Sequence, residues 1–236
     1  MKLTDKEFWK ASWKKYGITD WVDEEQEFVP EWHNVLYKTL LEYKGKDYFE
    51  IGCFPGRYLN YFYKMYGMKI NGIEFLAFNK KKSAFKIYTG DFLQFHSKKK
   101  YDLVCSFGFV EHFKDFPFII KKHIDIVNPN GIVLIVIPNF VHGLRFFIRR
   151  KLDKELFQIH FQNSMNIKIL KNELSKLANI DFSINRLKFS DKYFYQVSKT
   201  KKKIGKFLSF FIRMIPPLDR GLSAEIIVLI RPRKNK

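Results

Sequence analysis

The sequence is poor in cysteine, has no long apolar run and contains far fewer acidic than basic residues. Its 236 residues include two cysteines, Cys53 and Cys105, which are too few for a disulfide framework and are typical of a reducing compartment. No apolar run reaches the roughly 20 residues that span a bilayer, and none near the amino terminus resembles a signal peptide. These absences argue against a disulfide-stapled secreted domain and predict a cytoplasmic protein.

The shortage of acids leaves 43 Lys and Arg against 24 Asp and Glu, a net charge of +19. Such an excess favours an anionic partner, either nucleic acid, a phosphorylated small molecule or an acidic membrane surface. Lys, Asn, Ile, Phe and Tyr are abundant together, however, a bias that AT-rich coding also produces. Because no recognised RNA-binding motif accompanies the charge, nucleic acid is not the favoured partner. The six histidines are scattered, so their spacing predicts no metal site.

Residues 1–46 are predicted to form an amino-terminal helical cap that buries aromatic side chains, and a substrate lid is the alternative. Pro30 suits the first turn of a helix that runs to about Tyr43. The aromatic residues of this segment stand among charged ones: Phe8, Trp9, Trp13, Trp21, Phe28 and Trp32.

From residue 47 to 236 the pattern predicts one α/β domain with a mostly parallel sheet, because short apolar runs alternate with helical periods. Insertions are predicted near 138–166 and 196–222. The last two strands are expected to form an antiparallel edge. The expected helices cover 58–66 and 167–177, and the expected strands cover 47–51, 69–73, 86–89, 103–107, 131–137, 182–189 and 224–231.

A glycine-containing motif, Glu50 to Gly56, ends the first predicted strand and precedes the first helix. Gly52 and Gly56 let the backbone turn tightly and approach a ligand, while the helix amino terminus offers free N–H groups to an anion. The motif alone does not identify the cofactor. The spacing Gly-x-Gly-x-x-Gly of dinucleotide-binding folds is absent.

Acidic residues follow the second and third predicted strands. Glu74 ends the second strand, where a carboxylate can accept hydrogen bonds from ribose hydroxyls, of an adenosyl group or of NAD. Asp91 and Phe92 follow the third strand and offer a carboxylate for an adenine amino group and an aromatic face for its ring. The alternative role of Asp91 is a helix N-cap.

These motifs, with the fourth strand region up to His112 and the turn Asn128 to Gly131, resemble in their order the class I S-adenosylmethionine-dependent methyltransferase family over about residues 47–139. The resemblance implies a Rossmann-like three-layer αβα sandwich with a mostly parallel seven-stranded sheet and an antiparallel last strand. It also implies S-adenosyl-L-methionine as the cofactor.

The same resemblance implies roles for individual residues. It gives the ribose to Glu74, the adenine to Asp91 and Phe92, and the pocket wall to Ser106 and Phe107. Phe54 departs from the family pattern, which has a small residue there, and could crowd the cofactor. The residues that the resemblance assigns to the first loop are Glu50, Gly52, Cys53, Phe54 and Gly56.

His112 and Glu111 are the candidate catalytic residues beyond the fourth strand. His112 is the best-placed general base, and its alternative role is a structural histidine that caps the following helix. Glu111 either orients a substrate amine or faces solvent. His142 and His160 lie in the first insertion, where each either contacts substrate or covers the surface.

The predicted function is methyl transfer from S-adenosylmethionine to an oxygen or nitrogen of a small-molecule or glycan-type substrate. The alternatives are an RNA methyltransferase, an NAD-dependent oxidoreductase and a noncatalytic scaffold with the same fold. The basic, apolar segment 201–215 suits either peripheral membrane contact or a lid helix. The sequence leaves the oligomeric state open.

Overall fold

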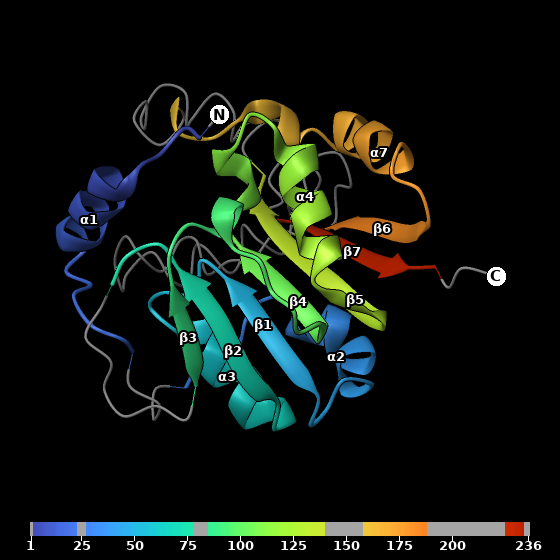
Figure 1. Ribbon diagram of the computed structural model, residues 1–236, viewed down its shortest axis with the longest axis horizontal. Coiled ribbons are helices and arrows are strands. Elements are labelled where there is room, and N and C mark those ends of the chain that lie inside the picture. Colours follow the sequence, from blue (N-terminus) through green and yellow to red (C-terminus); the bar gives the residue numbers. More distant parts are fainter. Residues whose placement is uncertain (1, 23–26, 78–84, 140–157, 188–224, 234–236) are drawn as a thin grey trace, which may run out of the picture.

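The computed structural model describes residues 2–22, 27–77, 85–139, 158–187 and 225–233, and they form one seven-stranded sheet (Figure 1). The strand order is β3-β2-β1-β4-β5-β7-β6. The strands are β1 (Asp47–Ile51), β2 (Lys69–Glu74), β3 (Lys86–Thr89), β4 (Tyr101–Phe107), β5 (Val127–Pro138), β6 (Ile180–Arg186) and β7 (Glu225–Pro232).

Strands β1 to β5 are parallel to one another, whereas β7 runs antiparallel to both β5 and β6. The predicted fold class is therefore confirmed. The strand order reverses between β1 and β4, which pair in register from Tyr48 opposite Leu103 to Ile51 opposite Ser106. In open parallel sheets, ligands bind at the carboxyl ends of the strands beside such a reversal.

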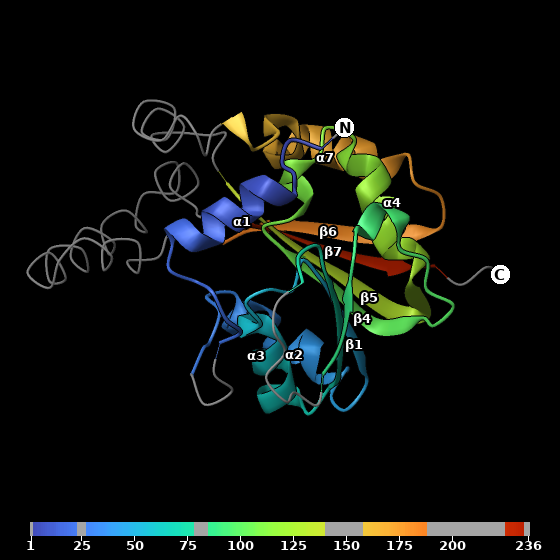
Figure 2. The ribbon, with the colours of Figure 1, turned by 60° about the vertical axis from the view of Figure 1, so that its left-hand side comes forward.

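Helices cover both faces of the sheet, α2 (His33–Leu41) and α3 (Arg57–Tyr66) on one and α4 (Phe116–Asp125) and α7 (Ile167–Ser175) on the other (Figures 1 and 2). Helix α3 buries Leu59, Phe62 and Tyr66, which share one face at helical spacing. It ends at Gly67, whose φ of 59° is the left-handed conformation typical of a helix C-terminus. Helix α4 begins where the Asp115 side chain accepts a hydrogen bond from the Phe118 N–H.

Two apolar clusters fill the spaces between the layers. Alternate residues of β1 point to opposite faces, so Phe49 packs with residues of α4 and α7 whereas Tyr48 packs with residues of α2 and α3. Trp32 is fully buried in the second cluster, just before α2. Burial on both faces explains why the central strands are almost continuously apolar.

Helix α1 (Lys6–Lys15) buries no residue and lies beyond the strand ends (Figure 2). Short 3-10 helices complete the described elements: η1 (Phe92–Gln94), η2 (Val110–His112) and η3 (Gln162–Met165). The helix expected from Pro30 begins at His33 and ends at Leu41.

Among the described residues, no helix is long and apolar enough to cross a membrane. The predicted segment 201–215, the second insertion at 196–222 and His142 lie outside the described residues.

Candidate active site

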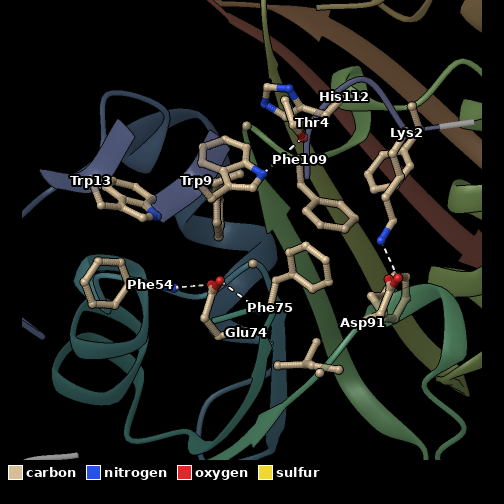
Figure 3. A pocket seen from close by; sticks show the side chains of 17 residues that line it. Lys2, Thr4, Trp9, Trp13, Phe54, Glu74, Phe75, Asp91, Phe109 and His112 are labelled. Atoms are coloured by element: carbon tan, nitrogen blue, oxygen red, sulfur yellow. Dashed lines mark hydrogen bonds and ion pairs between the residues drawn. The ribbon is translucent and has the colours of Figure 1, made fainter. Parts of the chain in front are cut away.

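The carboxyl ends of β1 to β4 surround a cavity, which we call the first pocket, of about 780 Å³ including its solvent-open mouth (Figure 3). Its other side is formed by the amino-terminal segment, through Lys2, Thr4, Trp9 and Trp13. The first pocket brings together residues that the sequence placed in separate motifs: Gly52, Phe54, Glu74, Asp91, Phe92 and Phe107.

The loop after β1 reaches the first pocket through Gly52 and Phe54. Gly52 has a φ of 71°, and a Cβ there would lie 3.0 Å from Cδ2 of Phe109. Any other residue would therefore be strained and would press on the opposite pocket wall. Gly56 does not line the pocket. Its φ is 92°, and a Cβ there would lie 2.9 Å from Cε3 of Trp21, so it is required for packing of the amino-terminal segment.

Phe54, the departure from the family pattern, lies at the edge of the first pocket and not across it (Figure 3). Its ring makes edge contacts with Trp13 and Trp21, at centroid distances of 5.2 and 5.3 Å. Phe54 is 5% exposed. The bulky side chain therefore joins the loop to the amino-terminal segment and leaves the middle of the pocket open.

Glu74 joins the loops after β1 and β2. Its Oε2 accepts a hydrogen bond from the Phe54 N–H at 3.1 Å, and its Oε1 accepts from the N–H groups of Phe75 at 2.8 Å and Leu76 at 3.3 Å. Burial raises the pKa of this carboxyl, although the three hydrogen bonds oppose the shift. A carboxylate has about four lone-pair positions, so roughly one remains for a ligand hydroxyl.

Asp91 has two partners in the first pocket. Its Oδ1 accepts a hydrogen bond from the Leu93 N–H at 2.9 Å and thereby caps η1. Its Oδ2 forms an ion pair with the Lys2 ammonium group (Figure 3). The Lys2 ammonium also lies 4.3 Å from the centroid of the Phe75 ring. A ligand amino group that binds Asp91 must therefore share or replace the Lys2 contact.

Three side chains predicted to contact the cofactor lie in the core and do not line the first pocket. Glu50 is 2% exposed and accepts a hydrogen bond from the Tyr48 hydroxyl at 2.8 Å, and burial raises its pKa. Cys53 packs beside Gly72. Ser106 is fully buried and bonds to Nε2 of His123 at 2.9 Å. Their side chains are fixed by interior packing, so at most their backbones can reach a ligand.

A second cavity, which we call the second pocket, lies on the other side of Trp9 and His112 and has a volume of about 980 Å³ including open solvent. Phe107 borders both pockets and stacks on Tyr58 with a centroid distance of 3.7 Å. Residues common to both linings are Trp9, Trp13, Phe107, Gly108 and His112.

His112 occupies the wall between the two pockets. Its Nδ1 donates to the carbonyl oxygen of Ile159 at 2.9 Å, and its ring contacts Trp9 edge-on. Burial and the neighbouring His160 lower the pKa of His112 to about 3, so the ring is neutral at physiological pH. The suggestion that it caps the next helix is wrong, because Asp115 caps α4.

Glu111 faces the second pocket and is 1% exposed, so the expectation that it faces solvent is wrong. Burial raises its pKa to about 8. His160 also lines the second pocket, and its Nε2 lies 3.9 Å from Oε1 of Glu111. The structure thus brings together a carboxyl and two imidazoles that the sequence spacing did not connect.

Sequence reasoning missed several pocket residues. Phe75 follows Glu74 directly, and Phe109 lies within the fourth strand region, so adjacency to predicted site residues was the available signal. Lys2 had no comparable signal as a pocket residue, whereas Trp9 and Trp13 belong to the segment for which a substrate lid was the alternative to a cap. They reach the pocket because the amino-terminal segment runs beside η2, where the Leu3 N–H donates to the carbonyl oxygen of His112 at 2.8 Å.

The sheet order, the loop after β1 and the acidic residues after β2 and β3 define a Rossmann-like domain with a pocket at the carboxyl ends of its strands. A family model described as a methyltransferase domain matches residues 24–177. The chain belongs to this methyltransferase family, as the sequence motifs predicted.

Solved structures with the same fold are distant in sequence. One is the plantazolicin methyltransferase BpumL in complex with a pentazolic desmethylPZN analog and SAH. The two structures align with a TM-score of 0.58 and 16% sequence identity, over 98% of this chain and 92% of the BpumL chain. Another is coclaurine N-methyltransferase bound to N-methylheliamine and SAH, with a TM-score of 0.52, 10% identity and coverages of 90% and 76%.

A third is phosphoethanolamine N-methyltransferase 2 of Haemonchus contortus, in complex with phosphomonomethylethanolamine and S-adenosylhomocysteine. Its TM-score is 0.54 and its identity 12%, and it covers 86% of this chain. The chain spans about half (53%) of that protein's length. No curated protein sequence matches the chain.

Proposed function

We propose that the protein transfers a methyl group from S-adenosylmethionine to an oxygen or nitrogen of a small-molecule or glycan-type substrate. The observation that carries this proposal is the convergence of Gly52, Glu74, Asp91 and Phe92 on one pocket. Glu74 would bind the ribose, and Asp91 and Phe92 the adenine. The family match and the SAH-bound structures with the same fold support this choice of cofactor.

The second pocket is the proposed site of the methyl acceptor. It shares a wall with the first pocket at Phe107, Gly108 and His112, so a methyl group held near this wall would face an acceptor on the other side. Methyl transfer from a sulfonium depends on positioning and on exclusion of water. The aromatic wall of Trp9, Trp13 and Phe107 supplies an apolar boundary of that kind.

His112 and Glu111 remain the proposed catalytic residues because both line the acceptor pocket. The low pKa of His112 favours a positioning or hydrogen-bonding role, since general bases work best with a pKa near the operating pH. Glu111 has an oxygen that accepts no hydrogen bond from the described residues. An acceptor hydroxyl or amine could donate to it.

Calorimetric titration tests the cofactor assignment. We expect S-adenosylhomocysteine and S-adenosylmethionine to bind with one site per chain, and we expect no binding of NAD. If NAD binds and neither sulfur compound does, the chain is an oxidoreductase-type binder and the proposal fails. If none of the three binds, the noncatalytic scaffold is the better account.

A further inference from the structure

Glu111, His112 and His160 form a buried cluster on the wall of the second pocket. One candidate ligand atom from each residue lies within 4.8 Å of the others. The three residues are 1%, 4% and 8% exposed respectively. This juxtaposition is separate from the residues proposed to bind the cofactor's ribose and adenine.

Backbone contacts fix the two short segments that supply the cluster. The Phe161 N–H donates to the carbonyl oxygen of Glu111 at 2.6 Å, and Nδ1 of His112 donates to the carbonyl oxygen of Ile159 at 2.9 Å. His160 lies between these two contacts and is therefore held beside Glu111 and His112. The backbone of the packed fold therefore holds the three residues of the cluster next to one another.

Two imidazoles and one carboxylate are the ligand types of catalytic Zn²⁺ sites and of non-haem Fe²⁺ sites. With metal–ligand distances of roughly 2.0–2.2 Å, two atoms on the same ion can be at most about 4.4 Å apart. The 3.9 Å separation of Glu111 Oε1 and His160 Nε2 fits this limit. All three candidate ligand atoms lie within 4.8 Å of one another. This upper bound exceeds the limit of about 4.4 Å by a few tenths of an ångström, so small side-chain movements would bring the three atoms onto one ion.

The surroundings of two ligands also suit a metal ion. Metal-binding histidines usually donate one ring N–H to a carbonyl or carboxylate, and His112 donates Nδ1–H to the carbonyl oxygen of Ile159. Glu111 Oε2 is buried and accepts no hydrogen bond from the described residues. Buried polar atoms are rarely left in this state, and a bound cation would satisfy the carboxylate.

We propose that Glu111, His112 and His160 bind one divalent transition-metal ion of the Zn²⁺ type at the second pocket. Three protein ligands leave at least one coordination position open. Because the three residues line the second pocket, that position would face the pocket and take an oxygen-donor ligand. While the ion is bound, Nε2 of His112 is a ligand and does not accept a proton.

Metal binding can be measured without cofactor or methyl acceptor. The full-length protein, freed of metal by a chelator, is titrated with Co²⁺, whose visible absorption reports inner-sphere nitrogen and oxygen ligands, and Zn²⁺ is then added in competition. We expect one Co²⁺ per chain, displaced by Zn²⁺, because Zn²⁺ has no geometric preference from its d electrons and suits a four-coordinate site. A wild-type protein that shows no such absorption and binds neither ion would overturn the proposal.

Variants locate the ion. Glu111→Gln and His160→Gln should each weaken Co²⁺ binding by more than about 100-fold, beyond the 10–100-fold typical of outer-shell changes. His96→Ala removes an exposed histidine and should bind as the wild type does. Circular dichroism of the metal-free variants checks their folding. If both cluster variants fold and keep wild-type affinity, the ion binds elsewhere and the proposal is wrong.

Discussion

Replacement of Glu74 by glutamine separates its role in the fold from its proposed role in cofactor binding. The carboxylate accepts three backbone hydrogen bonds, one from Phe54 and two from Phe75 and Leu76. A glutamine can keep its oxygen toward Phe75 and Leu76, but its NH₂ group then faces the buried Phe54 N–H. An unsatisfied buried donor costs about 1–3 kcal/mol, so we expect a melting temperature lower by about 2–10 °C.

Glu74→Gln should also weaken cofactor binding, independently of its effect on stability. Three of about four lone-pair positions of Glu74 are in use, so one strong bond to a ribose hydroxyl is available without rearrangement. A hydrogen bond to a charged group is worth about 1.5–3 kcal/mol, and its loss should weaken S-adenosylhomocysteine binding about 10- to 100-fold. Calorimetry at a temperature where the variant is folded measures this change.

The control is Glu42→Gln, which removes an exposed carboxylate at the end of α2 and should change neither property. If Glu74→Gln melts earlier but binds S-adenosylhomocysteine as tightly as the wild type, Glu74 holds the two loops together and does not bind the ribose. That result would refute the ribose assignment and leave the fold description intact.

Two further substitutions test the loop after β1 and the core beneath the pocket. Gly52→Ala places a side chain at a φ of 71° and 3.0 Å from Phe109. Chemical denaturation should therefore show a free energy of unfolding lower by about 1–2 kcal/mol, together with weaker S-adenosylhomocysteine binding. An unchanged free energy of unfolding would show that alanine is not strained at this position. His123 is fully buried, and burial lowers its pKa to about 4 from 6.5. As pH drops, the imidazole is protonated in the unfolded state at a higher pH than in the folded state. The free energy of unfolding of the wild type should therefore fall by about 3 kcal/mol between pH 6.5 and pH 4. The curve for His123→Gln, measured by urea denaturation across that range, should lack this component, and parallel curves would show that His123 is not the group that titrates.

The sheet was predictable because each strand and helix carries its own local pattern. Leu59, Phe62 and Tyr66 repeat at helical spacing, and most strand bounds lie within two residues of the predicted ones. Strand β6 ends three residues before its predicted end. Strand β5 begins at Val127, so the prediction of a turn over residues 128–131 is wrong. That Glu74 and Asp91 line the same pocket was predictable from the topology of the sheet. Both follow strands of a parallel sheet, and the carboxyl ends of such strands lie at one edge.

Contacts between segments remote in sequence could not be predicted in the same way. Nothing local indicates that Lys2 pairs with Asp91, or that Trp9 separates two pockets, because both depend on how the amino-terminal segment docks beside η2. Residues 1–46 were expected to act mainly as a cap, yet the described part serves two purposes. Trp32 is buried in the core, whereas α1 buries nothing and lines the pockets.

The direction of a side chain within a motif was also beyond the sequence. Glu50 and Ser106 belong to the right strands but point into the interior, because neighbouring positions on a strand face opposite sides. The cluster of Glu111 and His160 forms because η2 packs against the segment that leads into η3. The spacing of the histidines in the sequence does not indicate this packing.

The most direct test of the central claim is a crystal structure of the protein with S-adenosylhomocysteine. We expect the ligand in the first pocket, with a ribose hydroxyl within hydrogen-bonding distance of Glu74, the adenine beside Asp91 and Phe92, and the sulfur toward the wall formed by Phe107 and His112. In that complex the ion pair between Lys2 and Asp91 should either be broken or be shared with the adenine amino group. Ligand density outside the first pocket, or an adenosine that contacts neither Glu74 nor Asp91, would contradict the proposed cofactor site.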